Sequence, residues 1–347
     1  MKRIIRYILV LPLALLATYW LAGKYGDSLE EPVRKLLFAA KGDSIPNYAP
    51  EFVDEKGIPY VVYATENGIT PGKQYNATIV ANYALEYANQ YEATKDAAVK
   101  KSFMHCVQWL IANATVQGDT ALYMYPWRQA WYPAIPAPYT SGMTSGMVLQ
   151  VLLKAQQLQP DTSYATLGRQ LVNGCFRTID SGGFTIQEPQ GWWYEELAAP
   201  GVVTPRILDG HIFTIIGLLQ YRNAKQDTMA AIAAEMGLQS LRYFLPFYDA
   251  GNGNMYYDHL HKPADRKYKK VITGQMQTLF ELTGDSIYLQ YQQRWTAPMK
   301  RHYVHRMYAE RNKTGWVLFL GLLAVVWLVL YLFLKRLVRT KLKRRKQ

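Results

Sequence analysis

The sequence has few of the residues that hold small secreted folds and metal centres together. Among its 347 residues there are two cysteines, Cys106 and Cys175, and six histidines. The two cysteines could pair in an oxidising compartment, but each also fits an apolar helical pattern in which free thiols are commonly buried. His259 and His261 stand two residues apart in a loop, a weak spacing for metal ligands. The sequence predicts no metal site and leaves the disulfide open.

Two chemical signatures are also missing. There is no glycine-rich phosphate loop and no G-x-S-x-G nucleophile elbow. The residues therefore give no sign of a nucleotide-binding domain or of an α/β-hydrolase, and we predict no cofactor.

Positive charge is scarce in the middle of the chain. The net charge is +13, but Lys2, Arg3 and Arg6 carry three of these charges and residues 335–347 carry eight more. Only about +2 is left for everything between. This distribution argues against a nucleic-acid-binding surface, and the basic tail is suited to anionic lipid headgroups.

Apolar runs adjoin both basic ends. Residues 7–23 are about long enough to cross a bilayer, and residues 316–334 do so without a single charge. A cleaved signal peptide is the alternative for the first run. The positive-inside bias predicts a two-pass membrane protein with both termini in the cytoplasm and the main domain outside it. The predicted order is an anchor, a juxtamembrane amphipathic helix or linker, an extracytoplasmic domain, a transmembrane helix and a basic tail (1–23, 24–45, 46–308, 315–334 and 335–347).

Two short segments precede the main domain's helices. Ser28 and Glu31 have the spacing of a capping box, which predicts that an amphipathic helix begins there and runs to about residue 40. Within residues 44–75, Gly57 lies between β-branched and aromatic runs. This pattern predicts a small β-hairpin.

The rest of the domain repeats one helical pattern in pairs. Apolar residues recur at helical spacing from Asn76 to about Tyr308. The predicted helices span 76–92, 95–114, 142–158, 162–179, 209–224, 227–247, 271–284 and 286–308. Paired helices without intervening strands predict a mainly α fold, an (α/α) toroid whose connecting loops form a cleft at one end.

The connecting segments are rich in aromatic residues, proline and glycine, notably 123–139, 182–196 and 248–270. The chain has 27 tyrosines, and a ring with a polar tip suits a sugar, since its face stacks on C–H groups while its hydroxyl hydrogen-bonds. Arg128 and Trp131 lie in the first of these segments, where sugar contact and plain loop packing both fit.

Several segments resemble one known family. GWWYEE at 191–196 and ILDGHIFTIIGLLQY at 207–221 are similar to the C-terminal domain of the D-glucuronyl C5-epimerases, which convert glucuronate to iduronate in heparosan-type polymers. Residues 76–91, 140–158 and 245–261 resemble further segments of it. The resemblance covers about 50–296 and implies an (α/α) toroid and an isomerase acting on an anionic polysaccharide.

The resemblance also assigns residues. It implies catalytic roles for Tyr257, Tyr268 and Glu196, while Leu197 and Leu260 replace a tyrosine and an arginine of the family. The candidate substrate-binding residues are Trp193, Tyr194, Glu195, Arg128, Trp131, His261 and Arg266.

Epimerisation explains why such groups are wanted. A base removes the C5 proton from one face of the sugar, and an acid returns a proton to the other face. A tyrosine acting as base needs a pKa lowered by a cation. The basic residues around Tyr268 are expected to do this (Lys262, Arg266, Lys267, Lys269 and Lys270).

Other roles fit some of the same residues. Glu195 and Glu196 could cap the following structure or bind a lysine, and Asp209 could cap its helix or touch ligand. His211 is expected to be packed or to support the site from behind. Our first interpretation is a membrane-anchored uronyl C5-epimerase. The alternatives are a non-catalytic glycan-binding subunit of an exopolysaccharide synthesis or export complex, with polysaccharide-synthesis proteins as partners, and a uronate polysaccharide lyase.

Overall fold

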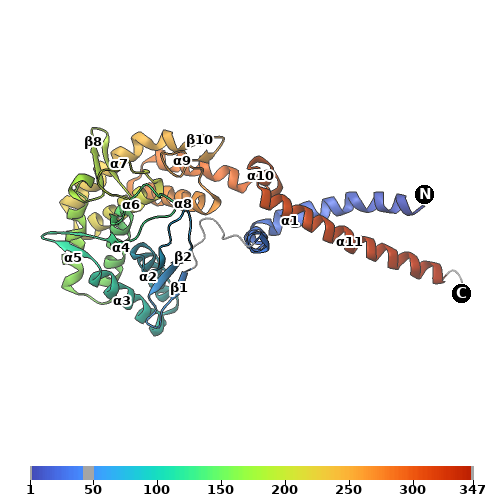
Figure 1. The fold of residues 1–347 in the computed structure, drawn as a ribbon, viewed down its shortest axis with the longest axis horizontal. Helices are drawn as coiled ribbons and strands as arrows, with labels where there is room; N and C mark the ends of the chain where they lie inside the picture. The colour runs from blue at the N-terminus through green and yellow to red at the C-terminus, as the bar shows by residue number, and fades with distance from the viewer. Residues whose placement is uncertain (1, 42–50, 345–347) are drawn as a thin grey trace. The chain divides into compact units, whose positions relative to one another are not determined.

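The structure, a computed structural model, describes residues 2–41 and 51–344 (Figure 1). It is mainly helical, as the sequence predicted. The chain forms two compact units, one of Pro46–Thr296 and the other of Met1–Ile45 with Ala297–Gln347. Residues 297–308, which we had placed in the main domain, therefore group with the terminal helices.

The unit of residues 46–296 begins with a small antiparallel sheet. Its strands are β1 (Glu51–Val53), β2 (Pro59–Tyr63) and β3 (Gly72–Gln74), in the order β1-β2-β3. Gly57 takes a φ of +81° in the β1–β2 turn, which glycine adopts at little cost. The predicted hairpin is confirmed from residue 51 onward, its expected start at 44–50 lies outside the described residues, and β3 was not foreseen.

Four helix pairs follow this sheet. They are α2 (Ala77–Thr94) with α3 (Ala97–Ala112), α4 (Gly142–Leu158) with α5 (Thr162–Gly174), α6 (Leu208–Lys225) with α7 (Thr228–Tyr248), and α8 (Arg266–Thr283) with α9 (Ser286–Thr296). The first members contact one another in the order α2, α4, α6, α8, and each packs against its own second member. This double layer has the order of contacts of an α/α toroid.

The turns inside the pairs are short because both helix ends are capped. Lys95 and Gly284 end α2 and α8 in the left-handed conformation, with φ of 55° and 71°. Asp96, Asp161 and Asp227 then accept hydrogen bonds from backbone N–H groups in the first turns of α3, α5 and α7. Such tight turns force neighbouring helices to run antiparallel.

The connections between pairs carry two-stranded antiparallel ribbons. Their strands are β4 (Thr115–Gln117) with β5 (Thr120–Leu122), β6 (Met124–Tyr125) with β7 (Tyr139–Thr140), β8 (Thr185–Glu188) with β9 (Gly191–Tyr194), and β10 (Asp249–Gly251) with β11 (Asn254–Met255). The first turns of α2 and α4 contact each other, and the first turn of α4 also contacts the connection that follows β9. Thr78 of α2 lies 2.7 Å from Thr144 of α4 between hydroxyl oxygens, and Gly142 N–H donates to Glu195 C=O at 2.8 Å.

Three predicted helix ends are corrected by the structure. α5 ends at residue 174 rather than 179, and α8 begins at Arg266 rather than 271 because the Asp265 carboxylate accepts from Tyr268 N–H and caps it. The single helix expected over 286–308 stops at Thr296. Residues 297–300, which include Pro298, form a 3-10 turn, and α10 (Tyr303–Ala309) follows.

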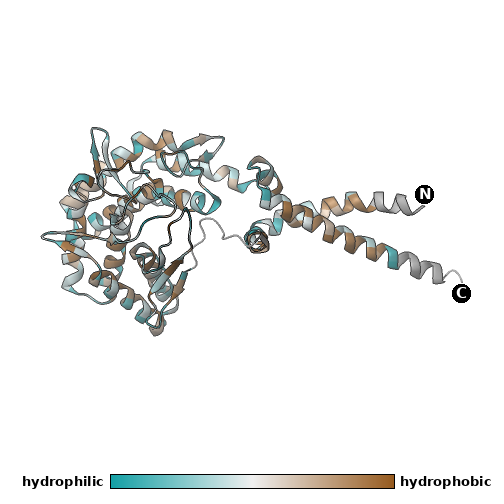
Figure 2. Cartoon of the chain, viewed as in Figure 1, coloured by the Kyte–Doolittle hydropathy of each residue, from teal (hydrophilic) through white to brown (hydrophobic). Residues whose placement is uncertain are grey.

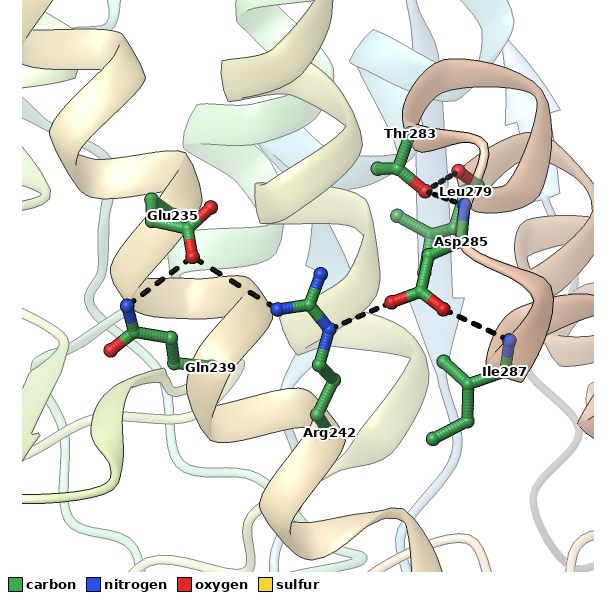
Figure 3. Close-up of polar contacts among 7 residues, drawn as sticks. All are labelled: Glu235, Gln239, Arg242, Leu279, Thr283, Asp285 and Ile287. Atoms are coloured by element: carbon green, nitrogen blue, oxygen red, sulfur yellow. Dashed lines mark hydrogen bonds and ion pairs between the residues drawn. The ribbon is translucent and has the colours of Figure 1, made fainter.

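Polar contacts tie α7 to the last pair. The Arg242 guanidinium of α7 donates to Asp285, which precedes α9, at 2.8 Å and reaches Glu235 two turns earlier in α7 (Figure 3). Asp285 in turn accepts from Ile287 N–H at 3.0 Å. Because all three side chains are partly exposed, the contribution of each ion pair to stability is about 1 kcal/mol or less.

The other unit consists of α1 (Lys2–Lys41), α10 and α11 (Lys313–Arg344), which contact one another. Tyr303 donates to Glu30 at 2.9 Å, and Arg306 pairs with Asp27. The predicted capping box is wrong, because α1 runs unbroken through Ser28, whose hydroxyl donates back to Tyr25 C=O.

One helix among the described residues, Lys313–Arg336, is long and apolar enough to cross a membrane. Figure 2 shows hydrophobic residues along most of this stretch of α11. The second span, predicted over residues 7–23, is not confirmed. Cys106 and Cys175 are buried free thiols, so the disulfide left open by the sequence is not formed.

The α4–α6 contact offers a test of this packing. A Cβ on Gly217 would lie 2.1 Å from Gly146 C=O, whereas one on Gly274 in α8 would meet nothing within 4 Å. We expect Gly217→Ala to lower the free energy of unfolding by about 1–3 kcal/mol or more through overpacking, measured by thermal unfolding in detergent. Gly274→Ala should be neutral or raise it by roughly 0.5–1 kcal/mol. Equal effects of the two variants would contradict the close α4–α6 approach.

Candidate active site

Four side chains from separate segments converge beside the beginnings of α6 and α8. Glu196 follows β9, Asp209 lies in the first turn of α6, Tyr257 follows β11, and Tyr268 lies in the first turn of α8. The Tyr257 and Tyr268 rings are 4.4 Å apart between centroids. Leu208 N–H donates to Tyr257 C=O at 3.0 Å, which ties the tyrosine loop to the start of α6. The structure thus brings together the three residues to which we assigned catalytic roles.

Gly210 lets Glu196 lie directly against α6. A Cβ at position 210 would be 2.7 Å from Glu196 Cβ and 2.8 Å from its Oε2. Asp209 is only 2% exposed, and Glu196 is half-buried. Among the described residues, neither Glu196 Oε2 nor Asp209 Oδ1 has a hydrogen-bond partner, although both atoms are buried. We call these two residues the carboxyl pair.

Burial governs the protonation of the carboxyl pair. It raises the pKa of Asp209 to about 7, although the nearby Tyr257 hydroxyl and the Lys267 charge lower it somewhat. It raises the pKa of Glu196 well above its usual range, and the Asp209 charge raises it further. Since two neighbouring buried carboxylates resist ionising together, the pair holds one proton at neutral pH.

The tyrosines are neutral, contrary to our expectation. Burial raises the pKa of Tyr257 and of Tyr268 above the ordinary value, and the charges of Asp209 and Glu196 add to the effect. The expected lowering by the basic run is wrong because burial dominates, and the charges of Asp209 and Glu196 act in the same direction. Of that run, Lys269 turns its ammonium to Asn254 at 3.1 Å, and Lys267 lies 5.8 Å from the Tyr268 ring centroid. Both tyrosine hydroxyls therefore keep their protons in the resting site.

A cleft of about 280 Å³ lies next to these residues, with Trp131, Tyr132, Leu260 and Lys262 in its lining. Tyr132 connects the cleft to the carboxyl pair. Its hydroxyl donates to Asp258 at 2.7 Å, and burial together with the charges of Asp258, Glu196 and Asp209 raises its pKa.

Three of the predicted substrate-binding residues are buried in the core instead. Trp193 and Tyr194 are both 0% exposed: Trp193 stacks on His211 at 3.9 Å, and Tyr194 donates to Ala233 C=O at 2.6 Å. Glu195 is also fully buried and accepts from Thr204 at 2.6 Å. These side chains hold the β9–α6 connection and cannot face a sugar, which corrects the prediction.

His211 is packed, as we expected. Its Nδ1 accepts from Tyr194 N–H at 3.0 Å, which leaves Nε2 to donate to Gly237 C=O at 3.2 Å. Burial lowers the pKa of His211 to about 3. The imidazole therefore stays neutral and braces Tyr194 against α7.

The remaining predicted residues occupy different places. Trp131 lines the cleft and donates its indole N–H to Glu66 at 2.9 Å. Arg128 is exposed and donates to Pro133 C=O, and His261 is exposed with its ring 4.7 Å from that of Tyr256. Arg266 lies in the first turn of α8, two residues before Tyr268.

Sequence reasoning missed one contributor to this site and assigned different roles to two others. Asp209 was expected to cap its helix or touch ligand, and Ile207 occupies the N-cap position, where it makes no side-chain cap hydrogen bond. Lys262 was expected to lower the pKa of Tyr268, but it lines the cleft. Tyr132, in the aromatic segment, also lines the cleft and was not foreseen. Its position in a connecting segment was the available signal. Over the described part of the chain, no group of three or more His, Cys, Asp or Glu side chains is placed to hold a metal ion.

Paired helices that carry acid–base groups beside an aromatic cleft are suited to carbohydrate processing. The chain matches the family described as D-glucuronyl C5-epimerase C-terminus over residues 117–297, more than half of its length. It belongs to this family of carbohydrate-processing proteins.

Individual relatives are distant. An uncharacterised protein of Methanocaldococcus jannaschii is 25% identical over 266 residues, covering 72% of this chain and 85% of that protein. The D-glucuronyl C5-epimerase of Caenorhabditis elegans is 24% identical over 168 residues, which are 45% of this chain but only 27% of the worm protein.

Solved structures with a similar backbone fold include those of an α-mannanase and a sugar epimerase. A GH76 α-mannanase of Bacteroides thetaiotaomicron has a TM-score of 0.48 at 13% identity, covering 81% of this chain and 72% of its own. A sugar epimerase from a ruminal bacterium has a TM-score of 0.46 at 11% identity, covering 70% and 65%.

The carboxyl pair makes stability depend on pH. The folded pKa of Asp209, about 7, exceeds the unfolded value of about 3.9. Its protonated form therefore contributes stability below pH 4 that is lost as the pH rises to about 7. An asparagine side chain cannot ionise, so the Asp209→Asn variant does not lose this stability. The free energy of unfolding of the variant minus that of wild type should therefore rise by about 2–4 kcal/mol between pH 4 and 8, measured by denaturant unfolding.

A matched control is Asp161→Asn at the start of α5. Asp161 is exposed, and its hydrogen bonds with Ser163 lower its pKa, so it is ionised from pH 5 upward. The stability difference between this variant and wild type should stay constant between pH 5 and 8. A constant difference for Asp209→Asn over the same range would show that Asp209 is not perturbed.

Proposed function

We propose that the protein is a membrane-anchored uronyl C5-epimerase that acts on a uronate-containing polysaccharide. The observation that carries this proposal is the convergence of the carboxyl pair with Tyr257 and Tyr268 beside an aromatic cleft. Epimerisation needs a proton acceptor on one face of the sugar and a donor on the other, and this cluster offers both.

The protonation states suggest how the cycle runs. The pKa of Glu196 is raised further than that of Asp209, so the single proton of the pair rests on Glu196 and Asp209 is ionised. Asp209, whose carboxylate lies near the Tyr257 hydroxyl, accepts the hydroxyl proton as the Tyr257 oxygen removes the C5 proton, and Glu196 returns a proton to the opposite face of C5. The pair begins and ends with one proton, now on Asp209, so the reverse reaction, in which Glu196 accepts and Tyr257 donates, can follow by the same path.

Tyr268 has a supporting place in this scheme. Its ring lies against that of Tyr257, and its own hydroxyl stays protonated because burial raises its pKa. A hydrogen bond from Tyr268 would stabilise the Tyr257 phenolate that forms when the proton is transferred. Leu197, which replaces a family tyrosine, is buried with 5% exposure and cannot share this role.

Deuterium exchange at C5 tests the proposal. In deuterated water, wild-type protein should introduce deuterium at C5 of heparosan or a related uronate polymer, detected by NMR. Tyr257→Phe and Tyr268→Phe should each reduce exchange by at least about 10²-fold, because the first removes the proton-transfer hydroxyl and the second removes the hydrogen bond that stabilises its phenolate. Polymer affinity should stay within about tenfold, since the rings remain.

Tyr256→Phe is the matched control, because its ring packs beside His261 and not against the carboxyl pair. It should exchange like wild type. Unsaturated chain ends would instead indicate elimination by a lyase. Binding without exchange or cleavage would overturn the enzyme assignment in favour of a glycan-binding subunit.

The membrane part of the proposal rests on α11, whose residues 313–336 are long and apolar enough to cross a bilayer. Eight positive charges follow in residues 335–347 and favour a cytoplasmic C-terminus. The main domain would then lie outside the cytoplasm, where it can meet exported polymers.

Cysteine labelling tests this topology. Cys106 and Cys175 are buried, so a single added cysteine reports its own side of the membrane. An impermeant maleimide should reach Ala250→Cys from outside and leave Arg345→Cys unlabelled until the membrane is opened. Lys2→Cys should behave like Arg345→Cys if the N-terminal segment also spans. Labelling of positions 250 and 345 from the same side would contradict the topology.

A further inference from the structure

The cleft beside Tyr132 has an unusual charge pattern. Its wall is mostly aromatic and aliphatic, from Trp131, Tyr132, Ile135, Val203 and Leu260 among others. Two charged residues also line it, Asp258 and Lys262. Its volume of about 280 Å³ is at the lower end for ligand pockets, which suits a single sugar unit rather than a long segment of polymer.

Asp258 is committed to holding the loop together. It is 1% exposed. Its Oδ1 accepts from the backbone N–H groups of Leu260 and Lys262, each at 3.0 Å, and its Oδ2 accepts from the Tyr132 hydroxyl at 2.7 Å. These three donors compensate the negative charge and fix the turn over residues 258–262. Asp258 is therefore not available to a ligand.

The charge of Lys262, unlike that of Asp258, is available to a ligand. Its ammonium lies 5.3 Å from the centre of the Tyr132 ring, and across the described side chains no carboxylate pairs with it. Its backbone C=O accepts from Tyr257 N–H at 2.6 Å, so the lysine and the proposed proton donor are held in one loop. The cleft thus carries one positive group whose charge is not compensated by the protein.

We propose that Lys262 binds the carboxylate of the sugar unit that occupies this cleft, so that the cleft selects uronate over neutral sugars. The aromatic wall would stack on the ring while the ammonium meets its single negative group. The inference builds on the proposed function, because a neutralised carboxylate is also what makes the C5 proton easier to remove. Selectivity in binding does not require catalysis, so the two can be tested apart.

Binding selectivity is measured with two probes, a heparosan hexasaccharide and the same hexasaccharide with its carboxylates reduced to alcohols. Calorimetric titration of the full chain in detergent should give wild type at least a tenfold preference for the carboxylated probe. Lys262→Met should bind the two probes within about threefold of each other. Lys262→Arg should recover most of the preference, because it restores the charge.

Lys225→Met removes the same charge at an exposed position in the last turn of α6 and controls for general attraction of anions. It should keep the wild-type preference. An unchanged preference in Lys262→Met, or an equal loss in Lys225→Met, would overturn the assignment of Lys262. C5 exchange by wild type on the uronate probe is measured separately. Loss of the lysine assignment would therefore not contradict the proposed reaction, and absence of exchange would not contradict the role of Lys262 in binding.

Discussion

The burial of two carboxyl groups against the start of α6 is the constraint around which this site is built. Glu196 can lie there only because residue 210 has no side chain. Gln275 of α8 donates to the backbone C=O of the buried Asp209 at 2.9 Å and so ties α8 to the start of α6. Low polarity makes two adjacent negative charges costly, so a proton stays within the pair near neutrality. The same burial keeps Tyr257 and Tyr268 protonated.

The helix layers bring the separated segments to this point. Gly146 and Gly217 let α4 and α6 approach closely, and the first turns of α6 and α8 then present Asp209 and Tyr268 next to each other. The connections between pairs carry the other functional side chains: Glu196 follows β9, and Tyr257 and Lys262 lie in the loop after β11. A rigid double layer thus carries a site whose reactive groups sit mostly on its irregular segments.

The cleft and the carboxyl pair have complementary roles in the proposed chemistry. The cleft presents a lysine with no carboxylate partner among the described side chains, over an aromatic wall. The neighbouring carboxyl pair and tyrosines supply the buried proton acceptors and donors. Tyr132 contributes to both, because it lines the cleft while its hydroxyl anchors Asp258. Recognition of a negative sugar and movement of its proton are therefore joined by one loop and one ring.

The sequence by itself determined the helix pairs, the family and the three residues Glu196, Tyr257 and Tyr268, because apolar periodicity and short motifs are local properties. It could not decide that Trp193 and Tyr194 are both buried. Adjacent residues of a strand point to opposite faces, and here both faces of β9 are covered by the core. Nor could it foresee the raised pKa values of the tyrosines: burial raises the pKa of Tyr268 most, and the charges of Asp209 and Glu196, which only folding brings close, raise it further. Burial and spatial proximity set protonation, and both belong to the tertiary structure.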